Sequence, residues 1–367
     1  MGWHFLLQEI IPTELVSPAL AGGFFTPEAP GKPRTKNKTT SLRVEKRNTS
    51  RTMGESVYLP EGIRIGKTEN IEHTSTVGGL ERACSTGMIL EGMAVLCDSS
   101  MSLHVELGNG LRGIIPRNEV VWECGGSETK DIAVITRVGK AVCFKVREIK
   151  YDAGGRPYAL LSRRDAQREC YECYLSHLKP GDVIPSKVTH LEHFGAFVDI
   201  GCGIVSLLSI DCISVSRISH PGDRFYIGQH IKTVIKSIEL ETGRIYVTHK
   251  ELLGTWLENS SLFSVGQTVA GIVRSIEDYG IFVELTPNLA GLAEYREGIT
   301  VGQTAAVYIK NIIPEKMKIK LVLIDSYKGE KKSGSYAVQA ENDGQSHISS
   351  WRYSPECCEK RIETFFD

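Results

Sequence analysis

The strongest constraint on the fold of this chain is an internal repeat that aligns without a gap. Residues 181–200 read GDVIPSKVTHLEHFGAFVDI, and residues 266–285 read GQTVAGIVRSIEDYGIFVEL. Apolar residues and glycines recur at matching positions, and Phe194-Gly195 of the first copy corresponds to Tyr279-Gly280 of the second. Self-similarity of this kind indicates a structural unit that the chain uses more than once.

Both copies continue into a second half with strand-like alternation, which begins at Gly228 in the first copy and at Gly302 in the second. The first copy is longer before this half, around the stretch SIDCISVSRISHPGDRFYI, which we interpret as a loop insertion. A weaker third copy starts at Glu91 and resumes at Val138, without an aromatic-glycine-aromatic element. About five short β-segments with glycine turns in each unit predict small barrels. Helices are expected in linkers such as SRRDAQRECYECYLSHL and HKELLGTWLEN.

Composition is that of an ordinary globular protein, with a net charge of −1, so a role with nucleic acid would depend on local basic patches and on aromatic stacking. Basic residues are concentrated between positions 137 and 168. That stretch is either a surface that follows phosphates or a solvated face paired with acids elsewhere. The cysteines are scattered through strand-like runs, which favours reduced thiols in a cytoplasmic protein. No apolar run is long enough to span a membrane.

The N-terminal residues differ in texture from the repeats. Residues 31–52 are polar and basic and are typical of a disordered segment, and Met53 is a candidate second start site. An early apolar stretch resembles a signal peptide only faintly, because Glu9 and Glu14 interrupt it.

The two strong copies resemble the S1 RNA-binding domain, the OB-fold repeat of bacterial ribosomal protein S1 and of several ribonucleases. The arrangement is similar to the short S1-domain proteins of Gram-positive anaerobic bacteria. The copy at 181 departs from the pattern at Ser186, where a glycine is expected. The second copy meets the whole pattern, at Gly266, Val269, Gly271, Val273, Ile276, Tyr279, Gly280, Phe282 and Val283.

The resemblance implies which residues would contact RNA. The stacking aromatics would be Phe194 with Phe197, and Tyr279 with Phe282. The histidine that the family has in the following strand falls on Ser206 and on Glu294, so neither copy has it, and the carboxylate of Glu294 would repel a phosphate. The basic residue at the end of the last strand falls on Lys250, on Arg164 in the weak copy, and on Ile324 in the last copy, where Lys318 and Lys320 come earlier in the strand. Independently of the resemblance, His193 and His249, which adjoin Phe194 and Lys250, are either further RNA contacts or ordinary surface histidines.

The spacing of Phe194 and Phe197 raises a geometric question. In a regular strand, residues three apart point to opposite faces, so both could be ordinary core residues. Because Gly195 permits a bulge or a sharp coil, we expect instead that both rings lie on one exposed face.

Other chemistry has weaker support. Cys170, Cys173 and His177 would share a helix face, but zinc prefers four ligands, so a plain helix is the favoured interpretation and a metal site the alternative. The sequence contains no phosphate-binding loop, no nucleophile elbow and no H-E-x-x-H motif. The C-terminal stretch HISSWRYSPECCEKRIETFF is either a tail that docks on a barrel or one that docks on a partner.

The sequence thus predicts an all-β chain of tandem five-stranded OB-fold barrels of the S1 type, with short helical linkers and disordered termini. The predicted function is single-stranded RNA or mRNA binding in translation, as a cytoplasmic, non-enzymatic protein without a cofactor, a small-molecule substrate or a membrane partner. The small ribosomal subunit is a further candidate partner. The alternative is a protein–protein adaptor that docks on the ribosome or on RNA-degradation machinery. The predicted regions are 1–75 (disordered or leader segment), 87–169 (degenerate S1-like domain), 176–257 and 262–326 (S1 domains) and 327–367 (C-terminal tail).

Overall fold

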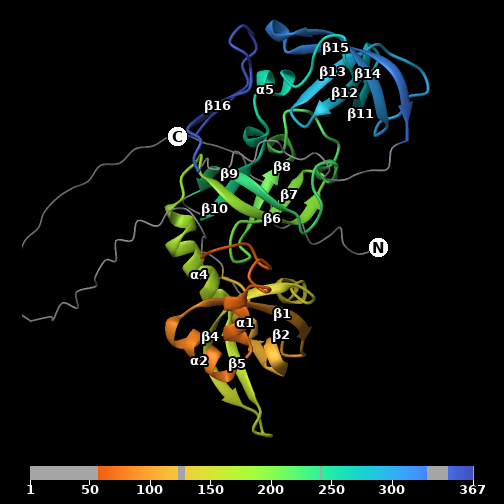
Figure 1. Cartoon of the computed structure of the whole chain (residues 1–367). Coiled ribbons are helices and arrows are strands. Elements are labelled where there is room, and N and C mark those ends of the chain that lie inside the picture. Colours follow the sequence, from red (N-terminus) through yellow and green to blue (C-terminus); the bar gives the residue numbers. More distant parts are fainter. Residues whose placement is uncertain (1–56, 123–128, 240–241, 329–345, 367) are drawn as a thin grey trace, which may run out of the picture. The chain divides into compact units, whose positions relative to one another are not determined.

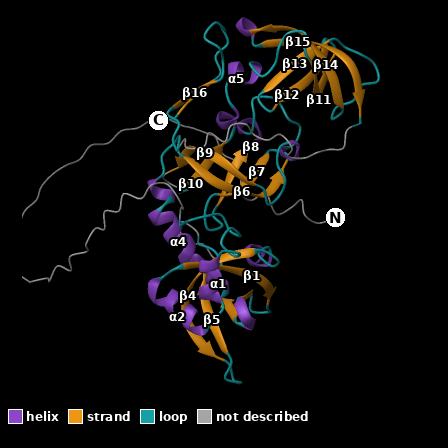
Figure 2. Cartoon of the chain, in the orientation of Figure 1, coloured by secondary structure: helices purple, strands orange, loops and turns teal. Residues whose placement is uncertain are grey.

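The computed structural model describes residues 57–122, 129–239, 242–328 and 346–366, and these residues form three closed five-stranded barrels and one small two-stranded sheet (Figure 1). The helices are few and short (Figure 2). The prediction of an all-β chain of tandem small barrels is therefore confirmed. Of the predicted disordered or leader segment 1–75, residues 1–56 lie outside the described ranges, and so do residues 329–345 of the predicted C-terminal tail 327–367.

Barrel 1 is the weak third copy of the repeat. Its core is a cluster of buried aliphatic residues around Phe144, which is fully buried. Helix α3 (Asp131–Ile135) lies between its third and fourth strands in sequence. The strands are β1 (Ile89–Cys97), β2 (Leu103–Glu106), β3 (Arg112–Ile115), β4 (Ala141–Tyr151) and β5 (Pro157–Ser162).

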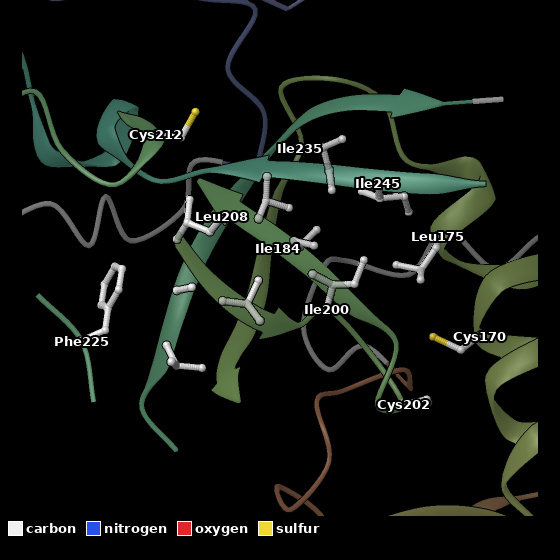
Figure 3. Packing of buried hydrophobic residues seen from close by; sticks show 14 of the residues in the cluster. Cys170, Leu175, Ile184, Ile200, Cys202, Leu208, Cys212, Phe225, Ile235 and Ile245 are labelled. Atoms are coloured by element: carbon white, nitrogen blue, oxygen red, sulfur yellow. The ribbon is translucent and has the colours of Figure 1, made fainter. Parts of the chain in front are cut away.

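Barrel 2 carries the first strong copy of the repeat. Its interior is filled by alternate residues of each strand, among them Ile184, Leu208 and Ile245, which Figure 3 shows together with their neighbours. Helix α4 (Arg163–Cys173) precedes it, and its Ser162 cap accepts a hydrogen bond from the backbone N–H of Asp165. The strands are β6 (Val183–Glu192), β7 (Gly195–Asp199), β8 (Val205–Ser209), β9 (His230–Glu239) and β10 (Arg244–Thr248).

Barrel 3 carries the second strong copy. It follows α5 (Trp256–Ser260), a helix with a capping box formed by Thr255 and Glu258. Each barrel closes in the same way, because the third and fifth strands pair in parallel while the other pairs are antiparallel. The strands are β11 (Thr268–Glu277), β12 (Gly280–Thr286), β13 (Leu289–Ala293), β14 (Thr304–Ile313) and β15 (Lys318–Tyr327).

The stretch before barrel 1 is structured from residue 57 onward, which differs from the prediction of a disordered or leader segment up to residue 75. It contains α1 (Thr68–Thr74), which is followed by α2 (Val77–Thr86). Leu80 and Ala83 of α2 are buried in the core of barrel 1. Polar contacts add to this packing, because Glu61 is buried against Arg163 at 2.7 Å, and the Asn70 side chain bonds the backbone of Glu91 at 2.8 and 3.0 Å. Hydropathy gives no sign of such long-range polar contacts.

The C-terminal segment, residues 346–366, packs on the protein itself. Its strands β16 (Ser350–Arg352) and β17 (Glu363–Phe365) form the small sheet. Trp351 and Tyr353 are buried in the cluster that includes the core of barrel 3, and the backbone N–H of Trp256 donates to Tyr353 O at 3.0 Å. Of the two alternatives that the sequence left open, this part of the tail therefore docks on a barrel.

The loop insertion, defined here as residues 210–227, lies between β8 and β9 of barrel 2. It contains the short 3-10 helices η5 (Ile210–Cys212) and η6 (Pro221–Asp223). Barrel 3 has only residues 294–303 between the corresponding strands β13 and β14. The two barrels therefore share one strand plan and differ in what surrounds the same face.

Candidate nucleic-acid interface

In barrel 2, the two phenylalanines lie on one exposed surface, which we call the barrel 2 platform (Phe194 and Phe197). Their ring centroids are 6.0 Å apart and their planes are nearly perpendicular, at 89°. Glu192 pairs with Gly195 across the hairpin, so Phe194 lies in the two-residue turn, whereas Phe197 lies in β7. Because a turn residue is exempt from the alternation of a strand, two aromatics three positions apart reach the same face. Phe194 is 47% exposed, a large aromatic area for water to contact.

Gly195 makes this turn possible for a different reason from the one expected. The bulge lies in β6, between Val188 and His190, and not at the glycine. A Cβ on Gly195 would lie 2.5 Å from the backbone oxygen of Leu208 and 3.0 Å from Cα of Ser209. The glycine is therefore needed because β8 passes too close for any side chain.

Barrel 3 repeats this geometry in what we call the barrel 3 platform (Tyr279 and Phe282). The ring centroids are 6.1 Å apart, the interplanar angle is again 89°, and Tyr279 is 69% exposed. Gly280 has a φ of +150°, and a Cβ there would lie 2.5 Å from the backbone oxygen of Ala293. Both repeats thus hold an edge-to-face aromatic pair on a strand-turn corner where only glycine fits.

A row of outward residues extends the barrel 2 platform across the barrel. Phe197 pairs with His190 on β6 and with Leu207 on β8, and Leu207 pairs with Tyr246 on β10. Paired residues share a face, so Tyr246 lies about 10 Å from Phe197 at the usual spacing of strands. His190 stacks beside Phe197 with centroids 6.3 Å apart, and its Nε2 bonds the Glu192 carboxylate at 2.7 Å.

Tyr246 is not among the RNA-contact residues predicted from the sequence. The signal was present, because Tyr246 lies between Ile245 and Val247, which are both buried in the barrel. Strict alternation in the run RIYVT therefore directs Tyr246 outward.

The corresponding row of barrel 3 ends in a cation instead of an aromatic ring. Phe282 pairs with Ser275 and with Leu292, and Leu292 pairs with Lys320 on β15. Lys320 is exposed and shares the platform face. Lys318, also exposed, lies on the same side of β15 but two residues further from this row.

In barrel 1, a histidine occupies the place of the second platform aromatic. His104 pairs with Leu96 and Ile114, as Phe197 pairs with His190 and Leu207. Its Nε2 is 2.9 Å from an oxygen of Asp98, whose pKa is lowered by hydrogen bonds from the Ser100 hydroxyl and from His104. At this position barrel 1 therefore has a histidine and not an aromatic pair of the platform kind, in line with the absence of an aromatic-glycine-aromatic element from its sequence.

Two of the predicted contact residues lie inside barrel 2 and not on its surface. The Ser206 hydroxyl is buried and donates to the backbone oxygen of Ile245 at 2.6 Å. His249 is buried against Phe225, its Nδ1 bonds Lys232 O at 2.8 Å, and burial lowers its pKa to about 4. Alternation along β8 points Ser206 inward, and the turn after β10 buries His249, so we leave both out of the proposed interface.

The remaining predicted residues are accessible in whole or in part. His193 is exposed beside Phe194. Lys250 is half-buried just after β10. The pKa of Asp211 in the insertion is lowered mainly by a hydrogen bond from the Ser209 side chain, and the charges of Lys236 and Lys250 contribute less. Arg164 is half-exposed at the start of α4 and donates to the backbone oxygen of Asn118 at 3.2 Å.

Several basic residues of the stretch 137–168 are paired with acidic residues within the described part of the chain. Arg163 is buried on Glu61, and both Arg147 and Arg168 bond Asp165, at 2.6 and 2.9 Å. The other acid–base pairs of this stretch are Lys145 with Glu169, Lys150 with Glu148, Arg147 with Glu119, and Arg112 with Asp152. The solvated, acid-paired alternative therefore accounts for this stretch better than a phosphate-binding surface.

Within the described ranges, no group of three or more histidine, cysteine, aspartate or glutamate side chains is placed to hold a metal ion. Cys170 is buried in the core of barrel 2, whereas Cys173 is exposed. These two cysteines and His177 are thus not brought together as a ligand set. The helices of the described residues are all too short or too polar to cross a membrane.

Comparison with known proteins shows what parts of this chain are similar to. Residues 177–250 match the S1 RNA binding domain family. The small ribosomal subunit protein bS1 of Staphylococcus aureus is 32% identical over 193 residues, which cover 51% of this chain and 47% of that protein. The bS1 protein of Rhizobium meliloti is 33% identical over 162 residues, covering 41% of this chain and 28% of its own.

The bS1 protein of Chlamydia muridarum is 25% identical over 230 residues, which cover 59% of this chain and 39% of that protein. This chain spans about half the length, or less, of the curated relatives that it matches. Residues 177–250, which include all five strands of barrel 2, are an S1 RNA binding domain, and the chain is homologous to ribosomal protein bS1 over about half of its length.

Proposed function

We propose that this protein binds single-stranded RNA, with mRNA as its cellular ligand, and that the barrel 2 platform is the principal site. The observation that carries the proposal is the exposed, edge-to-face pair of Phe194 and Phe197 on an S1 RNA binding domain. Two rings held in one orientation offer faces on which successive unpaired bases stack, and such stacking tolerates any sequence. The homology to bS1 supports a place in translation, in the cytoplasm and in contact with the small ribosomal subunit.

Binding, and not catalysis, is the role that these features support. The outward row of His190, Phe197, Leu207 and Tyr246 is mostly aromatic and aliphatic, which suits contact with base faces. Barrel 3 would add a second stacking pair, with Lys320 as a phosphate contact. Two modest sites on one chain raise the overall affinity because the second binding step is intramolecular.

The test is the affinity of the full chain for a short, unstructured, fluorescently labelled RNA, measured by anisotropy. We expect Phe194→Ala combined with Phe197→Ala to weaken binding by tenfold or more, since each lost stack costs about 1–3 kcal/mol. Tyr151→Ala is the matched control, because it removes an aromatic that is 64% exposed on barrel 1 and outside any pair. Unchanged affinity in the double variant would contradict the proposal that the barrel 2 platform binds RNA. If the full chain does not bind the RNA in the absence of other proteins, the result would favour the protein–protein adaptor.

A further inference from the structure

The insertion of barrel 2 brings a second imidazole to the edge of the platform. The ring of His220 lies against that of His193, with centroids 5.0 Å apart and planes at 81°. His193 is in turn the neighbour of Phe194 in the two-residue turn. The two imidazoles and the two phenylalanines thus come from segments separated in sequence and lie on one continuous surface. In barrel 3 the turn residue that corresponds to His193 is Asp278, and the loop that would face it is shorter.

His220 is held in a fixed orientation by its own backbone. It caps η6, and its Nδ1 accepts a hydrogen bond from the Gly222 N–H at 2.9 Å. The Asp223 carboxylate completes the capping box and also accepts from the backbone N–H and the hydroxyl of Ser219, at 3.3 and 3.1 Å. An Nδ1 that accepts must carry no hydrogen in the neutral ring, so Nε2 is the donor that His220 presents.

The rest of the insertion is fastened to the barrels by buried contacts. Phe225 is buried in the core of barrel 2, where Figure 3 shows it at the edge of the cluster. Arg224 is buried on the Glu284 carboxylate of β12, at 2.9 and 2.5 Å, and Asp223 lies 3.3 Å from Arg274. A buried ion pair of this kind is costly to break, so the loop keeps one conformation. His220 is therefore pre-organised, and a ligand would pay little to order it.

We propose that the insertion forms one wall of the RNA site of barrel 2, and that His193 and His220 donate to the phosphate next to the base stacked on Phe194. An imidazole N–H is a suitable donor to an anionic oxygen. Among the described residues, neither the His193 ring nor the His220 ring has an ion pair with a carboxylate, unlike the His190 ring, which bonds Glu192. The Asp223 carboxylate, which completes the cap of η6, is occupied by Ser219 and Arg274. This inference rests on the proposed function, because it takes single-stranded RNA as the ligand.

The experiment measures the affinity of the full chain for the same labelled RNA in three variants. The first is His220→Asn, because asparagine is itself a favoured cap and keeps the bond from Gly222 while it removes the ring. The second is the platform variant, Phe194→Ala with Phe197→Ala. The third is His177→Asn, which changes an exposed histidine on η4 (Leu175–His177), outside the platform. We expect His220→Asn to weaken binding about tenfold, as for a lost hydrogen bond to a charged group, and His177→Asn to bind like the wild type.

The outcomes separate the inference from the proposed function. If His220→Asn binds RNA like the wild type while the platform variant binds it more weakly, the proposed role of the insertion is refuted and the proposed role of the barrel 2 platform is supported. If His220→Asn is weakened and the platform variant is not, the insertion contacts RNA and the platform is refuted. If His177→Asn is weakened as much as His220→Asn, the loss does not belong to the insertion and the wall is refuted. A chain that does not bind the RNA at all refutes both.

Discussion

Barrel 2 and barrel 3 have the same strand order and the same aromatic corner, yet they offer RNA different surroundings. The platform of barrel 2 is bordered by His190, His193 and, from the insertion, His220. The platform of barrel 3 is bordered by acids, with Asp278 and Glu294 both exposed. The comparison teaches that the stacking pair is a property of the repeat, whereas the charge around it is set by each copy separately.

The last strand shows the same divergence. The register of the sheets places Tyr246 of barrel 2 where barrel 3 has Lys320, and His249 where barrel 3 has Leu323. Barrel 2 thus extends its aromatic row and buries a titratable ring, while barrel 3 has a cation and an aliphatic residue. Each pair of equivalent positions is a natural experiment, and the predictions below exchange or remove one member at a time.

The largest effect that we expect is a loss of stability of barrel 2 in acid. His249 is neutral in the folded state because burial, with a smaller contribution from the charge of Arg224, lowers its pKa from 6.5 to about 4. Above about pH 6.5 the ring is neutral in both the folded and the unfolded state, so His249 causes no change in the free energy of unfolding with pH there. As the pH falls from 6.5 towards 4, the unfolded chain takes up a proton that the folded chain does not. The free energy of unfolding should then fall by up to about 3 kcal/mol.

Amide hydrogen exchange is the suitable measurement, because several barrels need not unfold in one transition. Peptides from β9 and β10 should lose protection between neutral pH and pH ~4.5, after correction for the intrinsic exchange rate, in the range where His249 titrates. Peptides from β14 and β15 serve as the internal reference. The variant His249→Leu gives barrel 2 the residue type of barrel 3 and should remove most of this dependence. An equal acid loss in the variant would show that other groups cause it.

The sequence predicts many of the features in which barrels 2 and 3 agree or differ. Other features depend on tertiary contacts that the sequence pattern does not show. The repeat predicts the barrels, and the aromatic-glycine-aromatic element at Phe194, Gly195 and Phe197 predicts an exposed pair, although the bulge lies in β6 and not at the glycine. His220 could not be predicted as a neighbour of His193, since the contact depends on how an insertion with no counterpart in barrel 3 folds back. The burial of Ser206 was open to prediction from strand alternation, whereas that of His249 depends on the turn after β10.

The basic stretch 137–168 illustrates the limit more sharply. Its local excess of positive charge suggests a phosphate-binding surface, but part of that excess is paired with acids outside the stretch, namely Glu61, Glu119 and Glu169. Arg163 pairs with Glu61, more than a hundred residues earlier, inside the protein. Local charge counts cannot detect such a pair, because its partner is brought close only by tertiary structure.

The second prediction tests the last-strand contrast in RNA binding. Tyr246→Ala should weaken binding by about 1–3 kcal/mol, the usual value of one base stack, and leave its salt dependence unchanged. Lys320→Gln should weaken binding less, but it should reduce the slope of log K against log salt concentration by about 0.7, as one phosphate contact is lost. Tyr246→Phe and Lys320→Arg are the controls, since they keep the ring and the charge. If Tyr246→Ala and Lys320→Gln change the salt dependence of RNA binding equally, the proposed difference between a stacking residue and a phosphate contact is wrong.

The smallest predicted effect is a gain of affinity in barrel 3 from a single exchange. Asp278 occupies the turn position of His193, and a carboxylate that is about 6 Å from a phosphate in water repels it by less than about 1 kcal/mol. Asp278→His should therefore raise RNA affinity by roughly two- to fivefold.

The change is made in the chain that carries Phe194→Ala and Phe197→Ala, so that the residual binding reports on barrel 3. Asp278→Asn separates the two causes, because it removes the charge without adding an imidazole. If the asparagine variant gains as much as the histidine variant, charge alone distinguishes the two platforms at this position. If neither gains, the acidic border of barrel 3 does not lie on the path of the RNA.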